Sequence, residues 1–214
     1  MRRVGLLTAL GALAFVTANA QASACREPRR ISLEIDVQEA PIVIMNDITL
    51  DQLRSASDRL GKTPAHPVLG FYAGAVGYAL PTTIPTSTAA VGRSECPDTR
   101  LQVELVVVDR RIAIASELSN SPCRYRAALA HYQRHAAAAS AALHRFASGL
   151  QARLQPEIEL LNASAKEDIG ELRRALGERV DAALGKFNDG LRNLQQGVDR
   201  EGDTQRLSAP CDRT

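Results

Sequence analysis

The sequence predicts an α+β fold in which a small, mainly antiparallel sheet is followed by a helical hairpin of long helices. Alternating apolar and polar residues are confined to the first 122 positions, and helical periodicity fills most of the remaining chain. The chain has 214 residues, 45% of them hydrophobic, and no tryptophan, which suits one domain with an aliphatic core. We therefore expect a signal peptide (1–20), a β-rich half (21–122), a helical half of the same domain (123–200) and a C-terminal tail (201–214).

The first twenty residues have the layout of a secretory signal peptide. Arg2 and Arg3 precede an apolar run over 4–16, and the small residues Ala18 and Ala20 come after it. That run is too short for a transmembrane segment, and no later one approaches the roughly 20 residues that a spanning helix needs. We expect a periplasmic or secreted protein; lipoprotein attachment through Cys25 is the alternative.

The charge balance argues against polyanionic partners. The whole chain carries a formal net charge of +2, and removal of residues 1–20 takes away two arginines and no acid, which leaves a balance of zero. A nucleic acid or an acidic membrane surface is therefore a poor partner. An envelope protein remains a candidate partner, and the sequence specifies no oligomeric state.

Export gives the four cysteines a structural interpretation, because an oxidising compartment preserves disulfides. Cys96 and Cys123 bracket the strongest strand pattern, so a bridge between them would close a hairpin and leave Cys25 to pair with Cys211. We favour this pairing among the three that four cysteines allow. A thiolate metal site is the competing interpretation, but no C-x-x-C spacing supports it.

Two extended runs open the β-rich half. Residues 31–37 alternate with the two-residue period of a half-buried strand, and 42–44 resume an extended run after Pro41. Thr49 then stands where an N-cap would, before a short helix that closes at Gly61.

Short strands and turns are expected over 62–95, which is rich in Pro, Gly, Ser and Thr. The clearest alternation is at 101–107. The polar triplet Asp109-Arg110-Arg111 comes next, before a second apolar run at 112–116. This arrangement predicts a β-hairpin.

Two long helices are expected after Pro122. The first covers about 125–154 and ends before Pro156, and the second covers about 168–198. The second helix carries a continuous apolar stripe that consists of Ile169, Leu172, Leu176, Val180, Leu184, Phe187, Leu191, Leu194 and Val198. We favour burial of this stripe on the first helix. Pairing with a partner or a second copy is the alternative.

Two histidines one helical turn apart, His131 and His135, form the candidate metal site. On a helix they lie beside each other at the edge of the apolar arc, while Tyr132 lies in its middle and His144 points away. Residues at i and i+4 share a face and can hold one metal ion, zinc being the natural candidate, although histidines at a core edge also serve as packing residues. The candidates for a third ligand are Glu117, Asp199 and Asp203.

The segment around these histidines resembles a family of exported bacterial proteins of unknown function that are related to minimal gluzincin-type zinc proteases. In that family a sheet is followed by a helix of the form C-x-Y-R-x-x-L-x-H-E-x-x-H, and the likeness covers about 101–154. The matching residues are Cys123, Tyr125, Arg126, Leu129, His131 and His135. The tail, VDREGDTQRLSAPC, is similar to the family's ending. The resemblance implies a zinc site on the helix and hydrolytic chemistry there.

One position departs from the family pattern in a way that changes the predicted function. Tyr132 stands where H-E-x-x-H enzymes have the glutamate that takes a proton from the zinc-bound water, and a phenol is a poor base at neutral pH. The leading hypothesis is therefore a degenerate zinc-protease-like scaffold, non-catalytic, that acts by binding in the cell envelope. The first alternative is an active zinc-dependent hydrolase that uses another carboxylate, with Glu117 as the catalytic candidate. The second is a structural or interaction protein that uses its long C-terminal helix.

Overall fold

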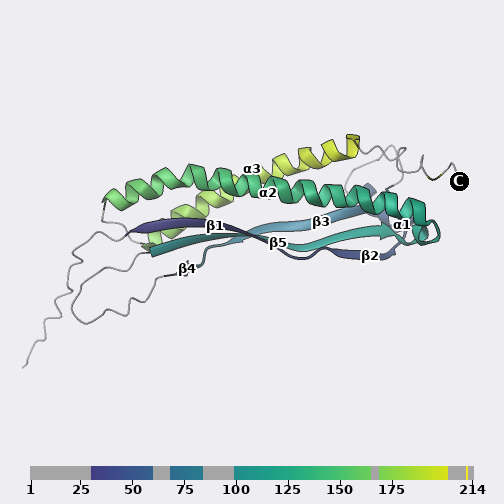
Figure 1. Ribbon diagram of the computed structural model, residues 1–214, viewed down its shortest axis with the longest axis horizontal. Coiled ribbons are helices and arrows are strands. Elements are labelled where there is room, and N and C mark those ends of the chain that lie inside the picture. Colours follow the sequence, from purple (N-terminus) through teal and green to yellow (C-terminus); the bar gives the residue numbers. More distant parts are fainter. Residues whose placement is uncertain (1–29, 60–67, 84–98, 165–168, 202–210, 212–214) are drawn as a thin grey trace, which may run out of the picture.

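The protein is elongated, with two long helices lying along one face of a twisted sheet (Figure 1). The computed structural model describes residues 30–59, 68–83, 99–164, 169–201 and 211. The predicted signal peptide, Cys25, Cys96 and Asp203 lie outside them. The elements are β1 (Ile31–Glu39), β2 (Val43–Ile48), α1 (Leu50–Arg59), β3 (Gly70–Ala79), β4 (Thr82–Thr83), β5 (Thr99–Ala115), the short 3-10 helix η1 (Ser116–Asn120), α2 (Pro122–Ser164) and α3 (Ile169–Glu201).

The sheet is mixed and is built around β5, so the predicted mainly antiparallel sheet is wrong. β1 and β2 pair with β5 in parallel, whereas β3 and β4 pair with it antiparallel. Glu39 of β1 lies opposite Val107, and Val43 of β2 lies opposite Arg111. The same number of residues separates each pair along its own chain segment, so β1 and β2 lie end to end along one edge of β5. Alternation of apolar and polar residues indicates a strand with one buried face, but it does not distinguish parallel from antiparallel pairing.

The predicted hairpin at Asp109-Arg110-Arg111 is instead a bulge in one unbroken strand of 17 residues. Ala73 of β3 pairs with Arg111 and Ala75 pairs with Val108, so two residues of β5 face a single residue of β3. Asp109 adopts a positive φ of 53°, the backbone conformation that accommodates the extra residue. The polar triplet looks like a turn, but pairing along both edges of β5 keeps the strand extended.

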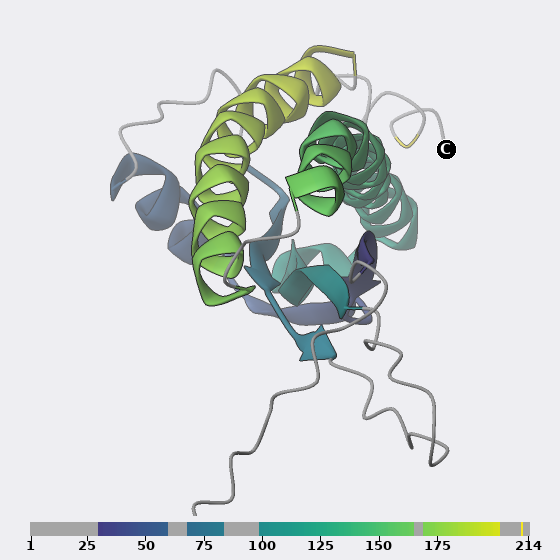
Figure 2. The same ribbon diagram turned by 90° about the vertical axis from the view of Figure 1, so that its left-hand side faces the viewer.

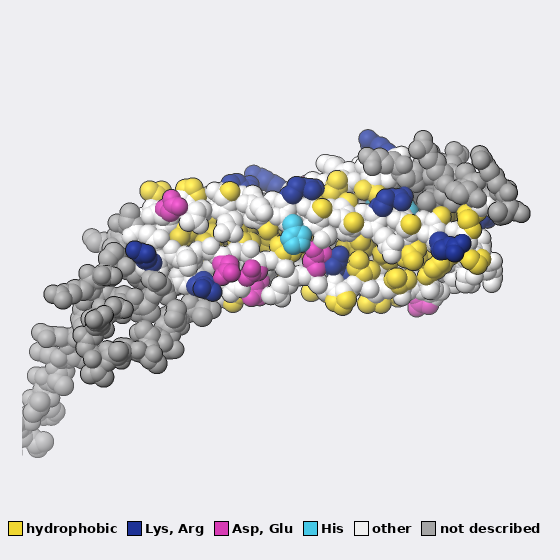
Figure 3. Space-filling model, in the orientation of Figure 1, with side chains coloured by type: hydrophobic (Ala, Val, Ile, Leu, Met, Phe, Trp, Pro, Cys, Tyr) yellow, Lys and Arg dark blue, Asp and Glu magenta, His cyan; other side chains and the backbone are white. Residues whose placement is uncertain are grey.

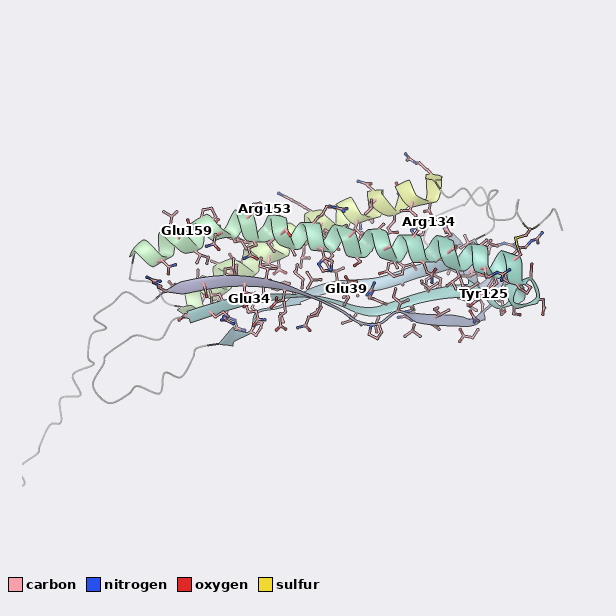
Figure 4. All side chains as sticks on the ribbon, in the orientation of Figure 1. Glu34, Glu39, Tyr125, Arg134, Arg153 and Glu159 are labelled. Carbon is pink, nitrogen blue, oxygen red and sulfur yellow. A yellow bond between two sulfur atoms is a disulfide. The ribbon has the colours of Figure 1, made fainter. Side chains whose placement is uncertain are left out.

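A largely buried ion pair links this bulge to the opposite edge of β5. Arg110 Nη1 lies 2.7 Å from Oε2 of Glu39 and donates to the carbonyl oxygen of Ala40 at 3.1 Å. Ser140 of α2 donates to the other oxygen of Glu39 at 2.5 Å. Figure 4 shows Glu39 between the sheet and α2. These contacts join the sheet to the middle of α2.

The two long helices pack together on the sheet, as the end-on view shows (Figure 2). α2 continues past Pro156 to Ser164, so the predicted end before this proline is wrong. Proline removes one helical hydrogen bond, but Leu154 and Ile158 on either side of it are both buried in the core, and their packing carries the helix through. The main core joins alternate residues of β5 to the facing sides of α2 and α3: Leu101, Val103, Leu105, Leu143, Leu150, Leu176, Val180 and Leu184.

The disulfide that the structure describes joins Cys123, in the first turn of α2, to Cys211. The predicted Cys96–Cys123 pairing is therefore wrong, and with it Cys25–Cys211. That prediction depended on a hairpin that would return the chain to its starting point. An unbroken 17-residue strand instead separates its two ends by about 50 Å.

No helix in the described ranges is long and apolar enough to cross a membrane. The disulfide is the observation that bears on cellular location, because such bonds persist in oxidising compartments outside the cytoplasm.

Candidate metal centre

His131 and His135 lie one turn apart in the first half of α2 and face α3. Their exposed fractions are only 5% and 6%, although both side chains are polar. Their Nε2 atoms point toward each other and lie 3.0 Å apart. Buried polar atoms require partners, and these two nitrogens share one small region between the helices.

Asp199, near the end of α3, completes the group. Its Oδ1 lies 2.9 Å from Nε2 of His135 and 3.5 Å from Nε2 of His131. α3 runs back along α2, so its last turns reach the first half of α2 (Figure 1). Within the described ranges, this is the cluster of histidine and acidic groups whose ligand atoms lie close enough to share a metal ion.

The other predicted ligands do not join this group. Glu117 lies in η1, where its two carboxylate oxygens accept from the backbone amide of Leu50 at 3.0 and 3.1 Å. It therefore caps the start of α1. Asp203 lies outside the described residues. His144 lies about two and a half turns beyond His135 on α2, and its Nε2 is 3.3 Å from Oε1 of Glu39.

The three converging atoms fit the dimensions of a zinc site. A point about 2.1 Å from all three atoms, the usual zinc–ligand distance, lies about 1 Å above the plane through them. This pyramidal arrangement leaves a fourth tetrahedral position for a ligand that these three side chains do not supply. Two imidazoles and one carboxylate favour zinc and neighbouring transition metals over magnesium or calcium, which prefer all-oxygen sites.

A glutamine on α3 orients His135 for metal binding. His135 donates from Nδ1 to Oε1 of Gln195, and Gln195 Nε2 donates to the carbonyl oxygen of His135 at 3.2 Å. With its proton on Nδ1, a neutral His135 presents an unprotonated Nε2 to the site. Outer partners of this kind fix the tautomer of histidine ligands in metal sites.

Arg134 has the opposite effect on His131. Its Nη2 donates to Nδ1 of His131 at 3.3 Å, which favours the tautomer with the proton on Nε2. Metal binding through Nε2 of His131 therefore requires Arg134 to give up this contact. Arg134 is exposed on α2 and can turn toward solvent (Figure 4).

The carboxylate of Asp199 is the negatively charged member of the group. Hydrogen bonds from His131, and then from His135, hold the pKa of Asp199 well below its ordinary value, so its carboxylate is charged near neutral pH. The same contacts also describe a group without metal, in which protonated imidazole nitrogens donate to Asp199. Metal analysis separates these two states.

Tyr132 belongs to the packing beneath the site. Its ring is 9% exposed and is stacked 5.8 Å from the ring of His135. Burial raises the pKa of the Tyr132 hydroxyl and the charge of Asp199 raises it further, so the phenol remains protonated and is no base. A Cβ on Gly70 of β3 would lie 2.7 Å from Tyr132 Cε2 and 2.2 Å from the carbonyl oxygen of Ala113, so only glycine allows this close approach.

Gln195, Arg134 and Gly70 were not predicted as site residues from the sequence. The sequence does contain an indication of Gln195, because it precedes Asp199 by four residues and therefore lies on the same face of the helix. No comparable signal marks Gly70, whose role depends on a contact between β3 and α2.

No protein-family model matches this chain, and neither the curated proteins nor the solved structures contain a significant match to it. The resemblance to zinc proteases therefore rests on the sequence alone, and its matching residues lie in α2. The His131, His135 and Asp199 group agrees with it only loosely.

Proposed function

We propose that this protein is a non-catalytic metal-binding protein of the cell envelope that holds one zinc-class ion between α2 and α3. The observation that carries the proposal is the convergence of two imidazole nitrogens and one carboxylate oxygen at separations of 2.9 to 3.5 Å. The orientation of His135 by Gln195 supports it, because this hydrogen bond selects the metal-binding tautomer.

The lack of a catalytic base at the expected position supports a binding role. Tyr132 is protonated and packed against β3. Glu117, the carboxylate proposed as a substitute, is committed to the amide of Leu50. In a zinc hydrolase a carboxylate must reach the metal-bound water, and none beyond Asp199 belongs to the described group.

Elemental analysis tests the proposal. The oxidised protein from residue 21 onward is stripped with a chelator, exposed to equimolar zinc and desalted, beside His131→Ala/His135→Ala and Gln195→Ala variants. We expect one zinc per chain in the parent and none in the double variant. A competition titration of the Gln195→Ala variant should show a zinc affinity about 10-fold to 100-fold weaker than that of the parent, the usual effect of losing an outer partner.

His144→Ala is the matched control, because it removes a histidine of the same helix that does not face the site. It should retain one zinc. Equal zinc content in the parent and the double variant, or none in either, overturns the proposal. Zinc-dependent peptide hydrolysis that disappears in Glu117→Gln would favour the hydrolase instead.

A further inference from the structure

α3 is attached to the rest of the protein in two different ways along its length. In its first half Leu176, Val180 and Leu184 are buried in the main core, and the hydroxyl of Tyr78 donates to the carbonyl oxygen of Gly177 at 3.2 Å. Beyond Leu184 no side chain of α3 from 185 to 200 is buried. The apolar stripe thus holds the first half firmly and the second half weakly.

The second half, here called the terminal segment (residues 188–201), is held largely through the candidate metal centre. Within the described ranges, the hydrogen bonds and ion pairs that leave this segment start from Gln195 and Asp199 and end on His131 and His135. The apolar side chains of this segment that face the protein are only half-buried, and a small cavity of about 30 Å³ remains beside Leu191.

We propose that metal binding latches the terminal segment of α3 onto α2. This inference rests on the proposed function, because it requires the metal. Two ligands come from α2 and one comes from the terminal segment, so an opening of the segment breaks the site. A ligand that binds only the closed form suppresses opening by the factor 1 + [metal]/Kd.

The length of chain between α3 and the disulfide allows such an opening. Cys211 is bonded to Cys123 at the start of α2, but the eleven residues 200–210 separate it from Asp199. A chain of that length can span up to about 40 Å, so the covalent link does not by itself hold Asp199 against the histidines. It keeps the opened segment close to α2, and the metal decides whether the segment is closed.

Hydrogen exchange measured by mass spectrometry tests the latch on the oxidised protein. Peptides from the terminal segment and from 169–187 are compared without metal and with free zinc at about 100 times its Kd, while bound zinc is counted in the same samples. We expect exchange in the terminal segment to slow by about 100-fold and exchange in 169–187 to change by less than about twofold.

Two variants of the terminal segment sharpen the test. Asp199→Asn should abolish the slowing. Asp189→Asn makes the same chemical change on the same segment, where the carboxylate pairs only with Arg192 among the described residues, and should preserve it. The latch is overturned if zinc binds without slowing hydrogen exchange in the terminal segment, or if exchange slows equally along the whole of α3. Either result is still compatible with the proposed metal site. No bound zinc overturns both the latch and the proposed function.

Discussion

Restoration of the protease motif by Tyr132→Glu should destabilise the protein and should not create a hydrolase. The tyrosine ring is 9% exposed and packs against His131, His135 and Gly70. Loss of a buried aromatic ring typically costs about 3–5 kcal/mol, and the new carboxylate would lie in a largely buried position near the charge of Asp199. Together, the lost ring and the buried carboxylate cost an amount that approaches the whole free energy of unfolding of an ordinary domain, about 5–15 kcal/mol.

Urea unfolding followed by far-UV circular dichroism measures the effect, since the chain contains no tryptophan. Tyr132→Phe is the control, because it keeps the ring and loses only the hydroxyl, whose oxygen faces the backbone amides of Gly70 and Leu69. We expect about 1–2 kcal/mol for the control and at least about 4 kcal/mol for Tyr132→Glu. A Tyr132→Glu protein within about 1 kcal/mol of the parent would refute the assignment of Tyr132 to the packing.

Two further predictions concern the metal centre and α1. Arg134→Ala should tighten zinc binding by about threefold to tenfold in a competition titration, because it removes the donor to Nδ1 of His131. Arg153→Ala is the control: this exposed arginine donates to the carbonyl oxygen of Gly149, and its loss should leave the zinc affinity unchanged. Glu117→Gln should lower the thermal stability near pH 7, and the loss should shrink as the pH is lowered stepwise below 4.5. Backbone hydrogen bonds, from its own amide and then from Leu50, lower the pKa of Glu117, so its contribution is present above the ordinary value of 4.5 and is lost as the pH falls through the lowered one. A destabilisation that stays the same from pH 7 down through the acidic range would contradict this role.

The positions of the helices could be predicted because their signal is long and periodic. The helical angle alone puts Tyr132 inside the apolar arc and His131 and His135 at its edge, and in the structure all three are buried. Asp199 was one of three candidate ligands. The choice among them required the path of α3 along α2, which the sequence does not contain.

The errors arose where distant pairing outweighs a local signal. Asp109-Arg110-Arg111 has the composition of a turn, yet β3 and the β1–β2 edge continue past it on either side of β5. Pro156 has the character of a helix end, yet buried residues on both sides of it keep α2 intact. The predicted Cys96–Cys123 disulfide was wrong for the same reason as the hairpin, because only a hairpin would have brought these two cysteines together.

The interruption of the β1–β2 edge limits the backbone pairing that this edge can offer to another strand. Exposed sheet edges are templates for aggregation, and here Val43 and Ile44 are 57% and 46% exposed. Hydrophobic side chains are visibly gathered toward the end of the molecule where β2 lies (Figure 3). Pro41, between the two strands, has no amide hydrogen to offer an incoming strand. The edge is thus divided into two short stretches, and neither offers a long unbroken row of backbone donors and acceptors to a neighbouring strand.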